Sequence, residues 1–168
     1  MNSTAFTNTT YPEKEILFRK ISTTTLLTGL LNLAFLIGKN YVESGKSPFF
    51  LLRYIASGAF GKEAFEGGRL MIIWGVVFHF IIAFLFTLIL FIAYPKLSPC
   101  LKNKFITGII YGLLAWAMMS FFVLPVSSIH QYPADIKESL TDVLIQICSI
   151  GIPISWIAGK FYAQRPSA

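Results

Sequence analysis

One stretch constrains the fold more than any other. Residues 70–94 form a run of 25 residues without a formal charge. A helix rises about 1.5 Å per residue, so this run reaches roughly 37 Å, while the hydrocarbon core of a bilayer is about 30 Å thick. It can therefore cross a membrane as a tilted helix. Only 13% of the 168 residues are charged, about half of what a soluble domain carries, so we expect an integral membrane protein.

Three more apolar segments follow the same pattern, and together they predict an all-α fold: an integral membrane four-helix transmembrane bundle. The expected spans are residues 21–38, 70–94, 105–123 and 140–161. We expect Pro95 to end the second span and Pro153 to kink the fourth, because proline lacks the N–H that a helix interior needs. The spans lie in one domain over residues 21–163, with a segment before it (residues 1–20) and a tail after it (residues 164–168).

A short interfacial helix is expected over residues 48–57, between the first and second spans. Ser47-Pro48 is typical of a helix start, with serine before the first turn and proline inside it. The apolar run that follows is too short to cross a bilayer, so we expect it to lie on the membrane surface.

Basic residues set the expected orientation. Four spans place both termini on one side of the membrane. Eight lysines and arginines fall on that side and six on the other, while the acidic residues are distributed two and six. Because basic residues are enriched on the cytoplasmic side, we expect both termini in the cytoplasm (N-in and C-in).

A polar residue stands at a similar expected depth in each span. At 1.5 Å per residue, Asn32, His79, Ser120 and Gln146 all fall in the outer half of the bilayer. This layer has two interpretations: a polar pocket or permeation path, or hydrogen bonds that only hold the bundle together. We expect His79 to face the interior and to bond to Gln146, otherwise to Asn32 or Ser120.

Glycines mark expected close contacts. Gly108 and Gly112 have the G-x-x-x-G spacing at which helices approach closely, and Gly75 extends the small-residue stripe of span two. One of the two glycines before span two should have a positive φ, since they give that helix a sharp entry. The long connection carries four loop glycines: Gly58, Gly61, Gly67 and Gly68.

Catalytic and metal sites are not expected. His79 and Cys148 could supply two ligands, but no third candidate stands at ligand spacing and a structural zinc needs four. No nucleophile, base and acid stand at recognisable spacing. We therefore expect no enzyme activity, no metal and no cofactor. The net charge of +6 is scattered, which does not favour nucleic acid as a partner.

Four stretches carry a resemblance to a known family. They are RYIASGAFGKEAFEGG from Arg53, GVVFHFIIAF from Gly75, YGLLAWAMMSFFVLPVS from Tyr111 and GIPIS from Gly151. Over residues 50–160 the chain resembles the YagU-like family of small four-span bacterial inner-membrane proteins, whose function is largely unknown. The resemblance implies a multi-pass protein of the bacterial inner (plasma) membrane.

Three function classes remain open. The leading hypothesis is a small non-catalytic inner-membrane protein with a structural or accessory role. The alternative is a small-solute or proton transporter, or a channel-like protein, that uses the polar layer around His79. The third is a membrane enzyme acting at the outer face. The inner halves of spans two and three are apolar, which argues against a channel in a monomer. We expect the lipid bilayer as a partner, and a second copy or another membrane protein as a further one.

Overall fold

The computed structural model describes residues 10–101, 103–129 and 136–164. Four helices are long and apolar enough to cross a membrane, so the chain is a multi-span membrane protein of the all-α class. Two of the spans contain a π-helical turn, labelled η. In chain order the elements are α1 (Thr10–Ser44), α2 (Pro48–Phe60), α3 (Glu63–Glu66), α4 (Gly68–Leu101), α5 (Lys104–Met118), η1 (Met119–Val123), α6 (Leu124–Val126), α7 (Ile136–Gln146), η2 (Ile147–Gly151) and α8 (Ile152–Ala163).

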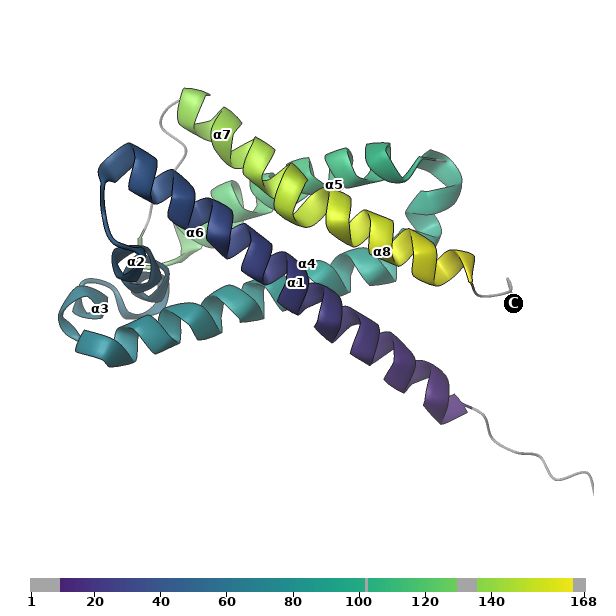
Figure 1. Ribbon diagram of the computed structural model, residues 1–168, viewed down its shortest axis with the longest axis horizontal. Helices are drawn as coiled ribbons and strands as arrows, with labels where there is room; N and C mark the ends of the chain where they lie inside the picture. The colour runs from purple at the N-terminus through teal and green to yellow at the C-terminus, as the bar shows by residue number, and fades with distance from the viewer. Residues whose placement is uncertain (1–9, 102, 130–135, 165–168) are drawn as a thin grey trace, which may run out of the picture.

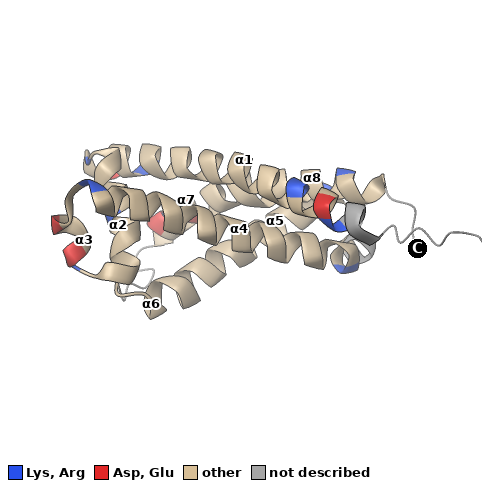
Figure 2. Cartoon of the chain, turned by 90° about the horizontal axis from the view of Figure 1, so that it is seen from below, with Lys and Arg blue, Asp and Glu red and all other residues tan. Residues whose placement is uncertain are grey.

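The bundle has two distinct ends. Helix α1 begins and α8 ends at one of them, which we call the terminal end (Figure 1). Helices α2 and α3 lie at the opposite end, which we call the α2 end. In Figure 1, α2 is seen nearly along its axis while the four spans run across the view, so α2 crosses the end of the bundle. Charged residues gather toward the two ends (Figure 2).

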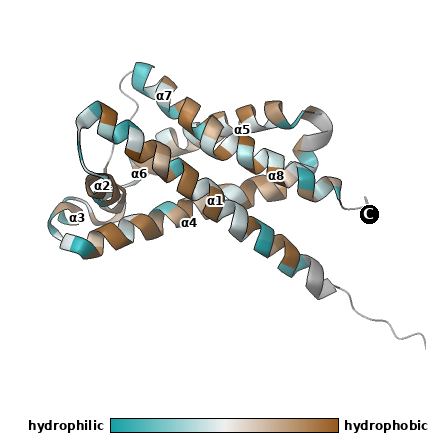
Figure 3. Cartoon of the chain, in the orientation of Figure 1, coloured by the Kyte–Doolittle hydropathy of each residue, from teal (hydrophilic) through white to brown (hydrophobic). Residues whose placement is uncertain are grey.

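The outward faces of the spans are apolar along their middle lengths (Figure 3). This is the distribution expected of helices surrounded by lipid, where the apolar face is not hidden in a core. Large exposed side chains on these faces include Leu30, Ile81, Leu85, Leu113 and Leu144.

The first two spans are longer than the sequence predicts. Helix α1 continues to Ser44, well beyond residue 38, and α4 continues through Pro95 to Leu101. The expectation that Pro95 ends the helix is therefore wrong. Proline at position 95 cannot supply an N–H to the carbonyl of Phe91, but the Tyr162 hydroxyl on α8 donates to that carbonyl at 2.8 Å. A neighbouring helix thus replaces the missing hydrogen bond.

Two other prolines each follow a π-helical turn. Pro125 comes after η1, and Pro153, which we expected to kink span four, comes after η2. The residue before each proline donates to a carbonyl five residues earlier: Leu124 to Met119, and Ile152 to Ile147. A proline ring clashes with the carbonyl four residues before it, and a turn widened by one residue gives the ring room.

Helix α5 crosses η2 and α8 at backbone distance. A Cβ at Gly108 would lie 2.8 Å from the Ile152 Cα, and one at Gly112 would lie 2.6 Å from the Ile147 Cα. A Cβ at Gly151, on the other side of this crossing, would overlap the carbonyl oxygen of Gly108. Any side chain larger than hydrogen at these positions would push the helices apart.

Glycines also shape the α2 end. A Cβ at Gly75 would overlap the carbonyl of Leu52, so α4 and α2 touch through their backbones. Gly58 lies inside α2, where its carbonyl accepts from the Ser128 N–H at 2.9 Å. Of the remaining loop glycines, Gly61 has φ 60° and Gly68 has φ 64°, whereas Gly67 has φ −75°. Gly68 is therefore the positive-φ residue at the entry to α4.

Candidate functional site

A cavity of about 380 Å³ lies at the α2 end, between α1, α2, α4, α5 and α7. All four residues of the predicted polar layer line its wall: Asn32, His79, Ser120 and Gln146. They come from the four different spans, so the bundle brings together residues that are far apart in the chain. Ser120 lies in η1, and Gln146 is the residue directly before η2. The π-helical turns thus stand beside the cavity.

Asn32 is the centre of a hydrogen-bonded group. Its side-chain Nδ2 donates to Ser149 Oγ at 2.8 Å and to Gln146 Oε1 at 3.3 Å. Ser149 in turn donates to the carbonyl of Ile145, one turn earlier in its own span, at 2.6 Å. These bonds tie α1 to the span formed by α7, η2 and α8. Asn32 is 4% exposed, so its amide is satisfied inside the bundle.

His79 faces the interior, but its partner differs from the predicted one. Nε2 lies 2.9 Å from the carbonyl oxygen of Gly29 on α1, and among the described residues the ring has no hydrogen bond to Gln146, Asn32 or Ser120. The prediction of a side-chain partner is therefore wrong. A carbonyl oxygen only accepts, so Nε2 carries the hydrogen and Nδ1 is the acceptor of the neutral ring. Within the described part of the chain, no group donates to Nδ1.

Ser120 differs from the other members of the layer. Its side chain is 7% exposed and lines the cavity. Serines inside helices usually bond to a carbonyl one turn earlier, as Ser149 does, but the Ser120 hydroxyl bonds to none of the described residues. The hydroxyl oxygen is not fully enclosed by protein, so it can be reached from the cavity. A molecule in the cavity could supply the missing hydrogen bond.

An ion cluster stands at the mouth of the cavity. The Lys39 ammonium on α1 lies 2.5 Å from Asp142 Oδ1 and 3.8 Å from a carboxylate oxygen of each of Glu43 and Glu138. Glu43 and Glu138 are 44% and 52% exposed, whereas Lys39 is 12% exposed. The exposed carboxylates show that the cavity opens at the α2 end. Burial, together with the charges of Glu138 and Asp142, raises the pKa of Tyr54 on α2, so its phenol is protonated at neutral pH.

The cavity ends where the apolar core begins. Ile150 lines the cavity and also belongs to a cluster of buried apolar residues that fills the terminal half of the bundle. That cluster includes Leu90, Phe91, Ile154 and Ala158, none of which is exposed. The described residues therefore form a cavity that opens at the α2 end and is closed toward the terminal end.

No family model, curated protein or solved structure matches the chain.

The cavity lining holds few groups arranged for covalent chemistry. Ser120 is the hydroxyl that could serve as a nucleophile, but it is not hydrogen-bonded to His79 or to a carboxylate among the described residues, so no nucleophile–base pair is formed. Cys148, which we considered with His79 as a metal ligand, is exposed while His79 is buried. What remains is a set of hydrogen-bonding groups below a charged mouth.

Sequence reasoning missed the ion cluster. From the sequence, Lys39 is one of the basic residues and Asp142 one of the acidic residues counted for orientation, and neither is considered as part of a pair. The signal that could have joined them is positional: one follows the first span and the other begins the fourth, so both stand at the same end of the bundle. Which of the charges at that end would pair depended on the crossing of α1 and α7.

Proposed function

We propose that this multi-span protein is a non-catalytic accessory protein of the bacterial inner membrane that holds a small molecule in the cavity at the α2 end. One observation carries the proposal: the four spans present polar groups to one cavity, and only part of these groups is paired across the bundle, by the bond from Asn32 to Gln146. Groups that only stabilise a bundle would be paired with each other. Here the Ser120 hydroxyl and the His79 Nδ1 have no partner among the described residues, so they are available to a ligand.

The placement in the membrane is part of the proposal. The excess of basic residues at the terminal end supports a cytoplasmic location for that end, and the cavity would then open to the outer face. The resemblance to YagU-like proteins supports the inner membrane of a bacterium. As an accessory protein, the chain would act with a second copy or with another membrane protein in the bilayer.

Thiol reactivity tests whether the cavity holds water and admits small molecules. Ile82 lines the cavity, while its neighbour Ile81 is 49% exposed on the outward, lipid-facing side of α4. In a background with Cys100→Ser and Cys148→Ser, we expect Ile82→Cys to react with a charged methanethiosulfonate reagent at least about tenfold faster than Ile81→Cys, because the reaction needs a hydrated thiolate. Equal rates for the two variants would contradict the proposal.

A transporter is the second candidate, and two observations favour it. The π-helical turns beside the cavity are places where spans can bend. In addition, Thr24 and Thr25 on the buried side of α1 have hydroxyl oxygens without a partner among the described residues, and they lie on the terminal side of Asn32. Uptake of a bound molecule into vesicles, above that of protein-free vesicles, separates a transporter from an accessory binding protein, for which we expect no uptake.

A further inference from the structure

We propose that the cavity takes a small organic monocation, with an ammonium group carried on an apolar body. This inference rests on the proposed function, because it names the class of molecule that the same cavity would hold. Three features of the described residues support it: the charge of the mouth, the aromatic side chains in the wall, and the unpaired groups deeper in the cavity.

The charge of the cavity lining is the first feature. Three carboxylates line it, from Glu43, Glu138 and Asp142, against two ammonium groups, from Lys39 and Lys46. His79 is buried inside a span, where the neutral ring is favoured over the charged one, and Tyr54 keeps its proton. One negative charge is therefore left over, which a monovalent cation balances. An anion would meet a surplus of carboxylates in a partly desolvated site, where charge interactions are stronger than in water.

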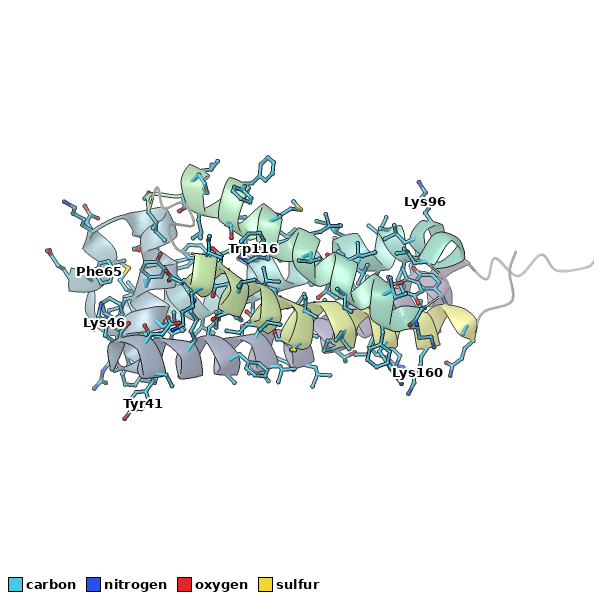
Figure 4. The ribbon with its side chains drawn as sticks, turned by 90° about the horizontal axis from the view of Figure 1, so that it is seen from above. Tyr41, Lys46, Phe65, Lys96, Trp116 and Lys160 are labelled. Atoms are coloured by element: carbon cyan, nitrogen blue, oxygen red, sulfur yellow. The ribbon has the colours of Figure 1, made fainter. Side chains whose placement is uncertain are left out.

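Aromatic side chains are the second feature. Phe50 and Tyr54 on α2, Phe86 on α4 and Trp116 on α5 all line the cavity. Figure 4 shows Trp116 near the middle of the bundle, between Lys46 at the α2 end and Lys160 at the terminal end. The face of an aromatic ring attracts ammonium groups, and rings around a cavity are the usual means of binding methylated amines. The protein already shows this contact at the mouth, where the Lys46 ammonium lies 4.0 Å from the Phe50 ring centroid.

The interior of the cavity is the third feature and is independent of the charge. Ser120 is 7% exposed and unpaired among the described residues, so a ligand that reaches it can supply or accept a hydrogen bond. Leu36, Ile55 and Ile82 add apolar wall for the body of the ligand. The volume of about 380 Å³ falls within the range of small-molecule pockets, about 300–1,000 Å³.

A set of three probes of similar size tests the charge preference. Benzyltrimethylammonium is the cation, neopentylbenzene is its uncharged isostere, and benzenesulfonate is an anion. Binding is measured by calorimetry on the full-length protein in dodecyl maltoside micelles, which carry no charge. We expect the cation to bind at least about tenfold more tightly than the isostere and the anion not to bind. Equal or weaker binding of the cation would overturn the inference.

Substitutions then test whether the preference for the cation over its uncharged isostere arises from residues that line the cavity. Trp116→Leu should weaken binding of the cation by about tenfold, and Glu138→Gln by about threefold, while binding of the isostere changes little. The matched controls are Trp156→Leu and Glu63→Gln, at an exposed tryptophan on α8 and an exposed glutamate on α3 that do not line the cavity. Unchanged isostere binding shows that each variant is folded. Equal losses in the controls would place the cation outside the cavity.

The ammonium group could belong to a free molecule or to a lipid headgroup. Adding phosphatidylethanolamine to the micelles, with phosphatidylglycerol as the control, distinguishes these sources. Competition by phosphatidylethanolamine alone identifies a lipid amine, and no competition by either lipid identifies a free organic cation. Both results keep the ammonium group as the feature that the cavity recognises.

Failure of this inference can be distinguished from failure of the proposed function. If the isostere or the anion binds best and protects Ile82→Cys from the thiol reagent, the cavity binds a molecule of another class and only the monocation inference is wrong. If Ile82→Cys reacts no faster than Ile81→Cys and no probe binds, both the inference and the proposed function are wrong.

Discussion

At the scale of single residues, His79 shows what a sequence reveals about a buried polar group and what it does not. Its position in an uncharged span predicts an interior-facing ring with a hydrogen bond. The partner could not be predicted, because it is the backbone carbonyl of Gly29, and any residue type carries such a carbonyl. Only glycine fits at position 29 without a shift of its neighbours, because a Cβ there would lie 2.7 Å from the Phe80 ring.

Asn32 and His79 should differ in what their hydrogen bonds contribute to stability. Replacing Asn32 by leucine leaves the Gln146 oxygen without its donor, so we expect a loss of about 2 kcal/mol in the free energy of unfolding. Replacing His79 by leucine should cost about 1 kcal/mol, because a helical carbonyl such as that of Gly29 normally keeps the N–H one turn later in its own helix. Denaturant unfolding in detergent measures both values.

The matched control for these variants is Asn40→Leu, at an asparagine whose hydrogen bond to the Lys46 carbonyl is exposed. We expect it to change stability by less than about 0.5 kcal/mol. If His79→Leu proves more destabilising than Asn32→Leu, the hydrogen bonds assigned to this layer are wrong.

At the scale of helices, the prolines mark the limit of local reasoning. The rule that proline ends a helix led us to stop span two at residue 94, yet α4 continues to Leu101. The rule is sound for an isolated helix, but Tyr162 on α8 supplies the hydrogen bond that Pro95 removes. The partner lies in another span, so the residues that neighbour Pro95 in the sequence do not indicate it.

A double-mutant cycle tests this explanation. Tyr162→Phe keeps the ring and removes the hydroxyl, and in the wild-type background we expect it to cost about 1 kcal/mol. In a Pro95→Ala background the alanine N–H can bond to the Phe91 carbonyl, so the same change should cost clearly less. The coupling is measured from unfolding free energies of the four proteins in detergent. Equal costs in the two backgrounds would show that the Tyr162 hydroxyl does not compensate for Pro95.

At the scale of the whole molecule, composition and the uncharged runs were sufficient for the fold class. Four long apolar helices and a short helix after the first span are present as predicted. Depth along each span also placed Asn32, His79, Ser120 and Gln146 at one level, and the structure brings them to one cavity. The charged mouth and the crossing of α2 over the bundle end were not predictable, because both depend on how the helices are arranged around the axis.

The central claim is that this cavity opens at one end of the bundle and is closed at the other. The most direct test labels Ile82→Cys with a membrane-impermeant charged thiol reagent applied to each face of oriented vesicles. Lys62→Cys at the α2 end and Lys96→Cys at the terminal end identify the faces, since both lysines are exposed. We predict that Ile82→Cys reacts from the face that labels Lys62→Cys and not from the face that labels Lys96→Cys. Reaction from both faces, or only from the Lys96 face, would contradict the account.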